Sequence, residues 1–370
     1  IRGHYVPTEY DTLTGEIRPC PYRQEGDITI VPRIFHAHDS LLLRLTPGTG
    51  ALAGTEDEGW MQVEAGAQRG PLKVTLSEPN ALLLDTAAYA FDDGEWQGPE
   101  ELLRVDNRFR QRLGYPLRME SLAQPWTLPP EEEPRHTLRL RFSVEAEVAT
   151  SGVRLAAEGM ERMTVTLNGA PVHLRPNGYY VDKAIQTAPL GNLRAGTNEL
   201  EVALRFNERT PVEWMYLLGD FGVRLEGALR VLTAPVTRVA CGDWARQGLP
   251  HYTGNLTYEL PFQGSGKEMA VRVPHYRGGL LRLALDGKDL GPLAYAPYRI
   301  ELGIVAPGPH TLDITCFGHR FNGFGAVHNA DRAVWWHGPN AWRSTGDAWS
   351  DEYNLAEMGV LSTPRFEERG

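Results

Sequence analysis

The sequence predicts an all-β chain with two jelly-roll sandwiches in tandem, preceded by a β-rich region with one helix. Residues 163–204 and 281–317 carry the same pattern: an alternating strand, an Asn-Gly or Asp-Gly turn, an aromatic segment, a glycine turn and a second alternating strand. Asn168-Gly169 and Asp286-Gly287 favour the positive φ angles of type I′ hairpin turns. A β-layer repeated at this distance indicates two similar domains. The 39 Gly and 27 Pro residues also suit many short strands joined by turns.

Changes of composition divide the chain into four expected parts. These are a β-rich linking region at 1–130, a first sandwich at 131–235, a second sandwich at 236–364 and a mobile tail at 365–370. The boundary between the first two parts is the Pro- and Glu-rich stretch 125–134, which favours a stiff, solvated linker.

One helix is expected, from Pro99 to Gly114. A proline at the start, glutamates in the first turn and a glycine at the end are the usual boundary signals of a helix. The residues that fall on one face of it are Leu102, Val105, Phe109 and Leu113. We therefore expect this face to pack against the sheets.

The composition argues against several classes of protein. A net charge of −10 argues against a nucleic-acid partner, because phosphate binding needs a clustered basic face. No apolar run approaches the roughly 18 residues of a membrane helix, so no membrane partner is expected. Three widely separated cysteines imply neither a disulfide framework nor a metal site. Because the chain begins at Ile1 with a strand in progress and no signal peptide, we expect it to be the C-terminal part of a longer protein.

The segment from Gly242 to Glu259 resembles a known opening. It reads GDWARQGLPHYTGNLTYE, which is similar to the entry strand of galactose-binding-like β-sandwiches in large bacterial glycoside hydrolases of the family two and rhamnosidase-like kinds. Three further segments resemble the stretches that lie between the catalytic barrel and the C-terminal modules of such proteins: 78–85, 123–126 and 217–223.

This resemblance implies a division of labour. In the family, a (β/α)₈ barrel supplies the catalytic acid and nucleophile, and the present sequence shows no βα alternation, so it is assigned no catalytic residue. We expect the non-catalytic, carbohydrate-binding and structural part of a bacterial glycoside hydrolase acting on plant or host glycans. Its partners would be an oligosaccharide or polysaccharide and a catalytic domain, upstream or on a separate chain, on which residues 1–130 pack. A structural Ca²⁺ is compatible with this family, no other cofactor is expected, and the location would be the bacterial cytoplasm or the secreted fraction.

The aromatic-rich stretch 317–349 is the predicted sugar site. Sugars stack their apolar faces on aromatic rings while amides, carboxylates and guanidinium groups hold the hydroxyls. The residues that supply this mixture are Trp336, Trp342, His328, Asn329, Asp331 and Arg343. The competing interpretation is that the tryptophans close the sandwich, since large aromatic side chains usually dominate cores.

A second candidate is a groove around residues 205–220. Its residues are Asn207, Glu213, Trp214 and Asp220. The alternative is a loop that packs on another domain. Glu213 and Asp220 also raise the hypothesis of a catalytic pair, which would need two carboxyl groups about 5–9 Å apart across a cleft. His36 and His38 alternate onto one strand face, but a third metal ligand is not apparent, so no metal site is assigned.

Two other functions stay open at this point. The chain could contribute residues to the active site of a two-part glycosidase, or it could be a purely structural interaction module. An apolar face left exposed on residues 1–130 would indicate a missing partner domain, and two carboxylates facing each other in one cleft would favour catalysis.

Overall fold

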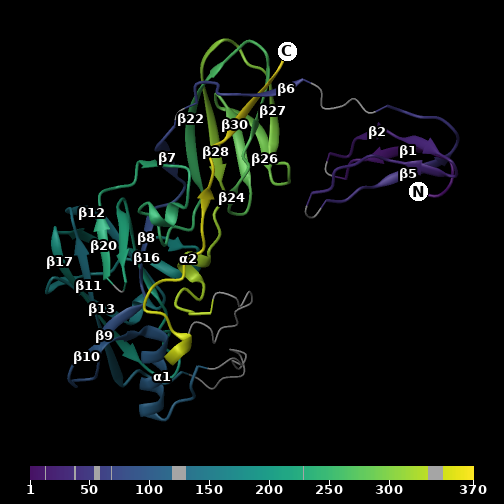
Figure 1. The fold of residues 1–370 in the computed structure, drawn as a ribbon. Coiled ribbons are helices and arrows are strands. Elements are labelled where there is room, and N and C mark those ends of the chain that lie inside the picture. Colours follow the sequence, from purple (N-terminus) through teal and green to yellow (C-terminus); the bar gives the residue numbers. More distant parts are fainter. Residues whose placement is uncertain are drawn as a thin grey trace.

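The computed structural model describes residues 1–12, 14–36, 39–53, 59–67, 69–118, 131–227, 229–331 and 345–370. Strands are by far the commonest regular element among these residues, which confirms the all-β class (Figure 1). They form a small N-terminal unit and two β-sandwiches, and a segment near the C-terminus joins the two sandwiches.

The N-terminal unit covers residues 1–53 and lies to one side of the sandwiches (Figure 1). Its main sheet places β1 (Tyr5–Tyr10) between β2 (Ile17–Pro19) and β5 (Leu43–Pro47), and a hairpin pairs β3 (Arg23–Glu25) with β4 (Ile28–Ile30). Among the described residues, the strand pairing of this unit stays within it.

The first sandwich packs a six-stranded path against a five-stranded sheet. In spatial order the six strands are β10 (Gln97–Glu101), β9 (Thr86–Phe91), β11 (His136–Ala146), β17 (Gly196–Phe206), β13 (Met163–Leu167) and β14 (Ala170–Val172). The hairpin of β19 (Gly222–Glu226) and β20 (Leu229–Thr233) extends this sheet by pairing with β11. The facing strands are β15 (Tyr179–Tyr180), β16 (Asp182–Leu193), β12 (Thr150–Ala157), β18 (Met215–Gly219) and β8 (Asn80–Leu84). A short 3₁₀ turn, η2 (Met160–Arg162), precedes β13.

The second sandwich has the same plan. Its six-stranded sheet runs β21 (Arg238–Val239), β7 (Leu72–Leu76), β22 (Leu256–Gly264), β28 (Gly308–Cys316), β25 (Leu281–Leu285) and β26 (Lys288–Leu293). The facing sheet runs β27 (Arg299–Ile304), β23 (Glu268–Arg272), β30 (Arg365–Arg369) and β6 (Trp60–Val63). The smaller elements are the β24 (Tyr276–Arg277) and β29 (Gly359–Val360) pair, η3 (Trp244–Arg246), α2 (Phe321–Phe324) and η5 (Gly346–Ala348).

The six-stranded orders of the two sandwiches correspond strand for strand. Reading each six-stranded order from its last strand, β14-β13-β17-β11-β9-β10 matches β26-β25-β28-β22-β7-β21. The predicted hairpin turns are equivalent as well: φ is 51° at Asn168 and 49° at Asp286, and 77° and 78° at the glycines that follow. Each turn residue accepts a hydrogen bond from the neighbouring long strand, Asn168 Oδ1 from Glu199 N and Asp286 Oδ1 from Thr311 N. The repeat predicted from the sequence is therefore a repeat of the fold.

The helix α1 (Leu102–Leu113) forms where it was predicted, three residues later than the expected start. Glu101 caps it by accepting hydrogen bonds from Leu103 N and Arg104 N, and Gly114 ends it with a φ of 71°. A glycine suits this left-handed position because a Cβ would strain it. Of the predicted apolar face, Leu102, Val105 and Phe109 are buried and Leu113 is partly buried. Phe109 stacks on Phe91 of β9 at 4.3 Å between ring centroids.

The strand pairing departs from the expected domain boundaries. Residues 1–130 do not form one region, because β6 and β7 belong to the second sandwich while β8, β9 and β10 belong to the first. In the sequence, the first sandwich is therefore an insertion in the second, between β7 and β21. The expected tail is also a strand: β30 pairs with both β23 and β6, and Phe366 is buried in the core. Local alternation identifies a strand, but it carries no record of a partner far away in sequence.

Candidate functional site

The second sandwich sends out a segment that reaches the first. Between β28 and β30, residues 317–331 and 345–358 leave the second sandwich, and we call them the bridging segment (Figure 1). Its helix α2 packs on the first sandwich, where Tyr216 donates a hydrogen bond from its hydroxyl to Gly323 O at 2.9 Å. The Phe324 ring lies 5.2 Å from that of Tyr216 and 5.7 Å from that of Tyr180.

The buried carboxylate of Asp85 also binds the bridging segment to the first sandwich. Asp85 follows β8 and has no exposed surface. One of its oxygens accepts hydrogen bonds from Arg230 Nη1 at 3.0 Å and from the Tyr353 hydroxyl at 2.9 Å. The other oxygen lies 2.7 Å from His328 Nε2. Two residues of the bridging segment are thus held by one acid of the first sandwich.

The protonation state of this cluster follows from its contacts. Burial alone would raise the pKa of Asp85, but the hydrogen bond from His328 and the charge of Arg230 outweigh it, so the pKa is lowered and the carboxylate is ionised. The other ring nitrogen of His328, Nδ1, faces Ser350 O at 2.7 Å. Because both neighbours are acceptors, only the doubly protonated ring donates to both.

Aromatic stacking extends the cluster to α1. The His328 ring stacks on Trp349 at 4.1 Å with an interplanar angle of 19°, and the Arg104 guanidinium lies 4.0 Å from the Trp349 centroid. The indole N–H of Trp349 donates to Asp351 Oδ1 at 2.8 Å. These contacts tie the bridging segment to the first helix as well as to β8.

Two further buried titratable groups lie near this cluster. Burial lowers the pKa of His251 to about 3; its Nδ1 accepts a hydrogen bond from Leu83 N, so its neutral ring carries the proton on Nε2. Burial raises the pKa of Glu101 to about 7, although Trp214 Nε1 and two backbone N–H groups donate to it. Both side chains are enclosed within the protein, so neither presents a reactive group to a cleft.

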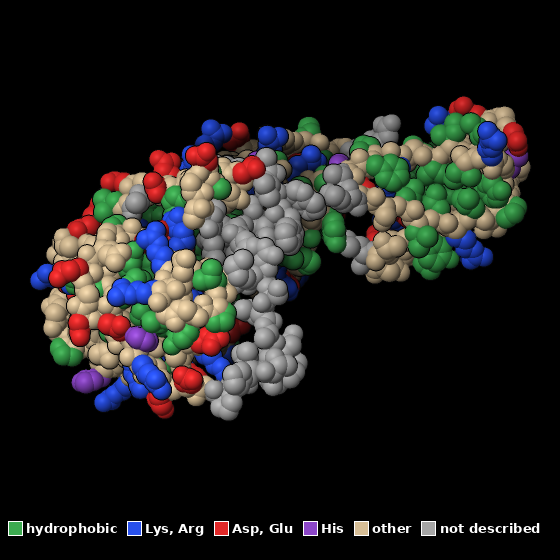
Figure 2. Space-filling view, turned by 90° about the horizontal axis from the view of Figure 1, so that it is seen from below, with side chains coloured by type: hydrophobic (Ala, Val, Ile, Leu, Met, Phe, Trp, Pro, Cys, Tyr) green, Lys and Arg blue, Asp and Glu red, His purple; other side chains and the backbone are tan. Residues whose placement is uncertain are grey.

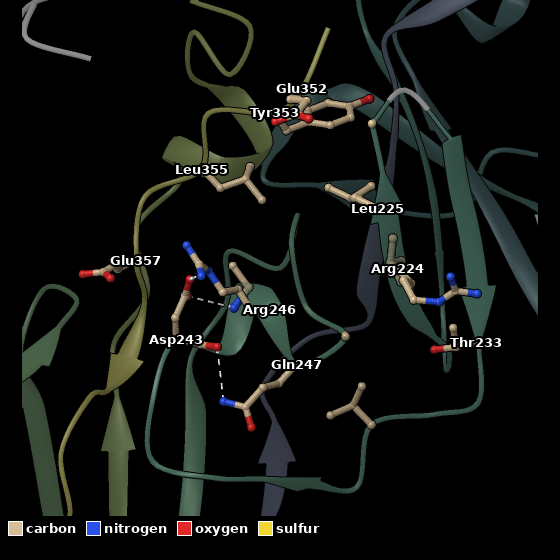
Figure 3. A pocket seen from close by; sticks show the side chains of 15 residues that line it. Arg224, Leu225, Thr233, Asp243, Arg246, Gln247, Glu352, Tyr353, Leu355 and Glu357 are labelled. Atoms are coloured by element: carbon tan, nitrogen blue, oxygen red, sulfur yellow. Dashed lines mark hydrogen bonds and ion pairs between the residues drawn. The ribbon is translucent and has the colours of Figure 1, made fainter. Parts of the chain in front are cut away.

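A cavity of about 800 Å³ lies between the two sandwiches, beside the bridging segment. We call it the inter-sandwich cavity (Figure 3). Its walls come from three parts of the chain: the β19–β20 hairpin of the first sandwich, residues 243–248 of the second, and residues 352–357 of the bridging segment. This volume falls within the range of about 300–1,000 Å³ that is usual for small-molecule sites.

Backbone contacts between the sandwiches hold the floor of the cavity. Val223 N donates to Gly248 O at 2.8 Å, and the buried side chain of Asn80 donates to Gly248 O and to Phe221 O. A Cβ on Gly248 would lie 2.6 Å from the side chain of Val236, and φ there is 91°, so the close approach requires glycine. The floor is therefore built from fixed backbone rather than from mobile side chains.

Of the predicted sugar-binding residues, those that the structure describes belong to the bridging segment. His328 is buried and committed to Asp85 and Ser350, so it is placed to hold the fold rather than a ligand. Asn329 pairs by its backbone with Trp349, and its Oδ1 accepts from the Asp331 backbone N–H. Trp336, Trp342 and Arg343 lie outside the described residues.

The second candidate groove is largely filled by its own contacts. Asn207 is buried and donates to Glu131 Oε1 and Glu132 O at 2.7 Å each. Trp214 is buried against Glu101. Glu213 forms an ion pair with Arg118, and Asp220 is exposed at the turn between β18 and β19. These contacts correspond to the packing alternative.

The sequence reasoning missed Asp85, Arg230 and Tyr353. A usable signal was present at the first of these, because an acid that directly follows five fully buried strand residues must find partners inside the protein. In the part of the chain that is described, no group of three His, Cys, Asp or Glu side chains could hold a metal ion; His36 belongs to that part and His38 does not. No helix among the described residues is long and apolar enough to cross a membrane.

Comparisons with protein-family models and with curated proteins found no match. Solved structures do match. The rhamnosidase from Novosphingobium sp. PP1Y shares 18% identity, with 64% of this chain and 23% of that chain covered and a TM-score of 0.25. A GH2 β-galacturonidase from Eisenbergiella tayi shares 13%, with 66% and 37% covered and a TM-score of 0.23. The β-D-mannosidase from Dictyoglomus thermophilum shares 13%, with 65% and 31% covered and a TM-score of 0.23.

These three structures are glycoside hydrolases by name. The present chain spans between 23% and 37% of their length.

Proposed function

We propose that this chain is the non-catalytic, carbohydrate-binding and structural part of a glycoside hydrolase that acts on plant or host glycans. The observation that carries the proposal is the bare apolar surface of the N-terminal unit, at the right of the view in Figure 2. Such a surface is the feature expected of a unit that packs on a missing catalytic domain.

The N-terminal unit exposes far more apolar side chain than it buries. Its exposed large hydrophobic residues are Ile1, Val6, Ile17, Ile28, Ile34, Phe35, Leu42, Leu45 and Leu52. Its buried apolar side chains, among residues described, are Pro7, Cys20 and Tyr22. None of its residues belongs to the hydrophobic cluster of either sandwich, again among those described. The apolar residues that should form a core are instead at the surface.

A sheet with an exposed apolar face needs a second layer to pack against in order to be stable. Each ordered residue costs roughly 1–2 kcal/mol of backbone entropy, and burial of apolar surface is the main term that offsets this cost. A sheet must bury its hydrophobic face against another layer. We infer that the missing layer belongs to the catalytic domain, and that the two sandwiches then hold carbohydrate beside it. In this proposal Trp336 and Trp342 remain predicted sugar contacts.

Hydrogen exchange on the intact chain tests whether the N-terminal unit lacks the buried surface that a partner domain would supply. We expect the amides of β1 and β5 to exchange at least about a hundredfold faster than those of β11 and β17, because little buried surface protects the N-terminal unit. Protection of β1 and β5 equal to that of the sandwich strands would show that the unit needs no partner, and would overturn the proposal.

A dye whose fluorescence increases on binding to hydrophobic surfaces can locate the apolar surface of the N-terminal unit. Phe35→Ser should reduce dye fluorescence, whereas Ile304→Ser, which alters an even more exposed apolar residue on the second sandwich, is the control and should change it less. Equal effects of the two substitutions would contradict a concentrated surface on the N-terminal unit.

Two functional assays separate the proposal from its alternatives. The purified chain should bind soluble plant or host polysaccharides in affinity electrophoresis and should release no chromophore from aryl glycosides. Turnover of an aryl glycoside would favour a chain that contributes catalytic residues. Absence of both binding and turnover would favour a purely structural module.

A further inference from the structure

We infer that the inter-sandwich cavity binds a neutral sugar residue, held between Arg246 and Asp243 on one side and the apolar walls on the other. This inference rests on the proposed carbohydrate-binding function and gives it a location outside the predicted tryptophan-rich stretch.

The cavity is a formed structure in the protein. Its three walls are joined by bonds already described: Val223 to Gly248 across the sandwiches, and Asp85 to Tyr353 between the first sandwich and the bridging segment. Asp243 adds a third joint, because its Oδ1 accepts from Ala245 N and from Met358 N. A site whose walls are fixed before binding loses little entropy when a ligand enters.

Several polar groups in the cavity retain bonding capacity. Asp243 uses Oδ1 for the fold, while its Oδ2 forms an ion pair with Arg246 Nε at 3.7 Å, a distance too long for a hydrogen bond, so both groups can still bond a hydroxyl. The Arg246 side chain is 84% exposed. Glu352 and Glu357 are exposed on the bridging segment. By contrast, the Gln247 amide is fully engaged with Ala240 and with the Asp243 backbone.

This set of groups suits hydroxyls better than charges. A sugar hydroxyl donates to a carboxylate and accepts from a guanidinium, so Asp243 and Arg246 together complement a pair of hydroxyls. The charged groups that line the cavity are Arg224, Arg246, Asp243, Glu352 and Glu357, two cations against three anions. With no excess of positive charge, the lining disfavours a phosphate or a uronate and favours a neutral ligand.

Apolar side chains complete the match. Leu225 from β19 and Leu355 from the bridging segment project toward the cavity from different walls, with Tyr353 above them (Figure 3). The C–H faces of a pyranose pack on such surfaces. Because the Tyr353 hydroxyl is bound to Asp85, its ring is held in place as part of the wall.

Titration calorimetry with methyl glycosides of glucose, galactose and mannose on the intact chain tests this inference, with galacturonate as the charged probe. Arg246→Ala and Leu355→Ala should each weaken binding of the preferred neutral glycoside by about tenfold or more. Arg282→Ala, an exposed arginine on β25 of the second sandwich, is the matched control and should leave affinity unchanged. Affinity for the neutral glycoside should also be insensitive to added salt.

The outcomes separate the inference from the proposed function. If Trp336→Ala abolishes binding while the two cavity variants bind normally, the cavity is not the site and the carbohydrate-binding function stands. If galacturonate binds more tightly than every neutral glycoside, the neutral-sugar assignment is overturned. If the chain binds neither these glycosides nor any polysaccharide, both fail together.

Discussion

The two sandwiches share the strand order of their six-stranded sheets but differ in the length of the connections between equivalent strands. In the first, residues 92–96 join β9 to β10 and residues 207–214 join β17 to β18. In the second sandwich, the equivalent connections are much longer. The whole first sandwich is inserted between β7 and β21, and the stretch that includes the bridging segment is inserted between β28 and β30. The framework thus specifies the fold, while the insertions at two joints create both the Asp85 cluster and the inter-sandwich cavity.

The hairpin turns offer a finer comparison. In the first sandwich Asn168 Nδ2 donates to Asn198 Oδ1 at 3.1 Å. At the equivalent place in the second, Asp286 Oδ2 lies 2.6 Å from His310 Nδ1. The backbone geometry is the same and the side-chain chemistry is not, so one turn is neutral and the other depends on protonation.

The largest expected effect comes from breaking the joint between the sandwiches. Asp85→Ala removes the acceptor shared by Arg230, His328 and Tyr353 and leaves a buried guanidinium with fewer partners. Loss of one member of a buried charge pair typically costs about 3–5 kcal/mol. We expect urea unfolding to show a loss of this size, and limited proteolysis to cleave the bridging segment sooner than in the unaltered protein.

Asp289→Ala is the matched control for this substitution. Asp289 forms an exposed ion pair with Arg282 in the second sandwich, and pairs of this kind contribute little to stability. We expect no measurable change in the unfolding midpoint. Equal effects of Asp85→Ala and Asp289→Ala would contradict a special role for the joint.

The second effect is a pH dependence carried by His251. Its pKa, lowered by burial to about 3 from 6.5, means that the neutral ring is favoured in the folded state. The contribution is complete above pH 6.5 and is lost as the pH falls toward 3, because the unfolded chain binds the proton first. His251→Asn keeps an acceptor for Leu83 N and removes the titration, so the stability gap between the two proteins should narrow by roughly 4–5 kcal/mol over this range.

The measurement is urea unfolding of both proteins at several pH values between about 7 and 4, an interval over which roughly 3 kcal/mol of this change should appear. Glu101, whose pKa is raised by burial, acts in the opposite direction, but it is present in both proteins and cancels in the difference. A gap that stays constant as the pH falls would show that His251 titrates alike in the folded and unfolded states.

Much of this fold follows from local patterns in the sequence. Asn-Gly and Asp-Gly predict turns because few other residues adopt positive φ easily, and Gly114 predicts the end of α1 for the same reason. The insertion of one sandwich into the other was not predictable in this way. The pairing of β7 with β21 joins Leu72 to Val239, and nothing local to either residue specifies its partner.

The candidate site was less predictable than the fold. The sequence predicts Trp214 and His328 as ligand contacts, but each side chain contacts a buried carboxylate of another segment: Trp214 contacts Glu101, and His328 contacts Asp85. The sequence supplies the chemical groups and not their partners, so a polar residue that holds the fold resembles one that binds a ligand. The inter-sandwich cavity was missed for the same reason, because its walls come from three segments far apart in the chain.

A smaller effect is expected from the turns themselves. Asn168→Ala and Asp286→Ala each place a Cβ without a hydrogen-bonding group at a φ near 50° and remove the acceptor used by Glu199 N or Thr311 N. We expect each to cost about 1–2 kcal/mol, measured by urea unfolding near pH 8. Because the backbones match, the two costs should agree at this pH; a clear difference would contradict the equivalence of the hairpins.

The smallest effect separates the turns by protonation. His310 Nε2 faces Ala306 O and Nδ1 faces Asp286, so the doubly protonated ring satisfies both, and the hydrogen bond to Asp286 raises the pKa of His310. A raised folded-state pKa gives stability that is complete below pH 6.5 and is lost as the pH rises through the folded value. Asp286→Asn, which makes the second turn resemble the first, should therefore be most destabilising near about pH 5.5 and nearly neutral above about pH 8. In the first sandwich Asn168→Asp provides the reverse exchange: it turns a carboxylate toward Asn198 Oδ1 where no histidine is present, so its cost should persist at pH 8. If thermal unfolding shows the Asp286→Asn cost unchanged between these pH values, the protonated pair does not distinguish the two turns.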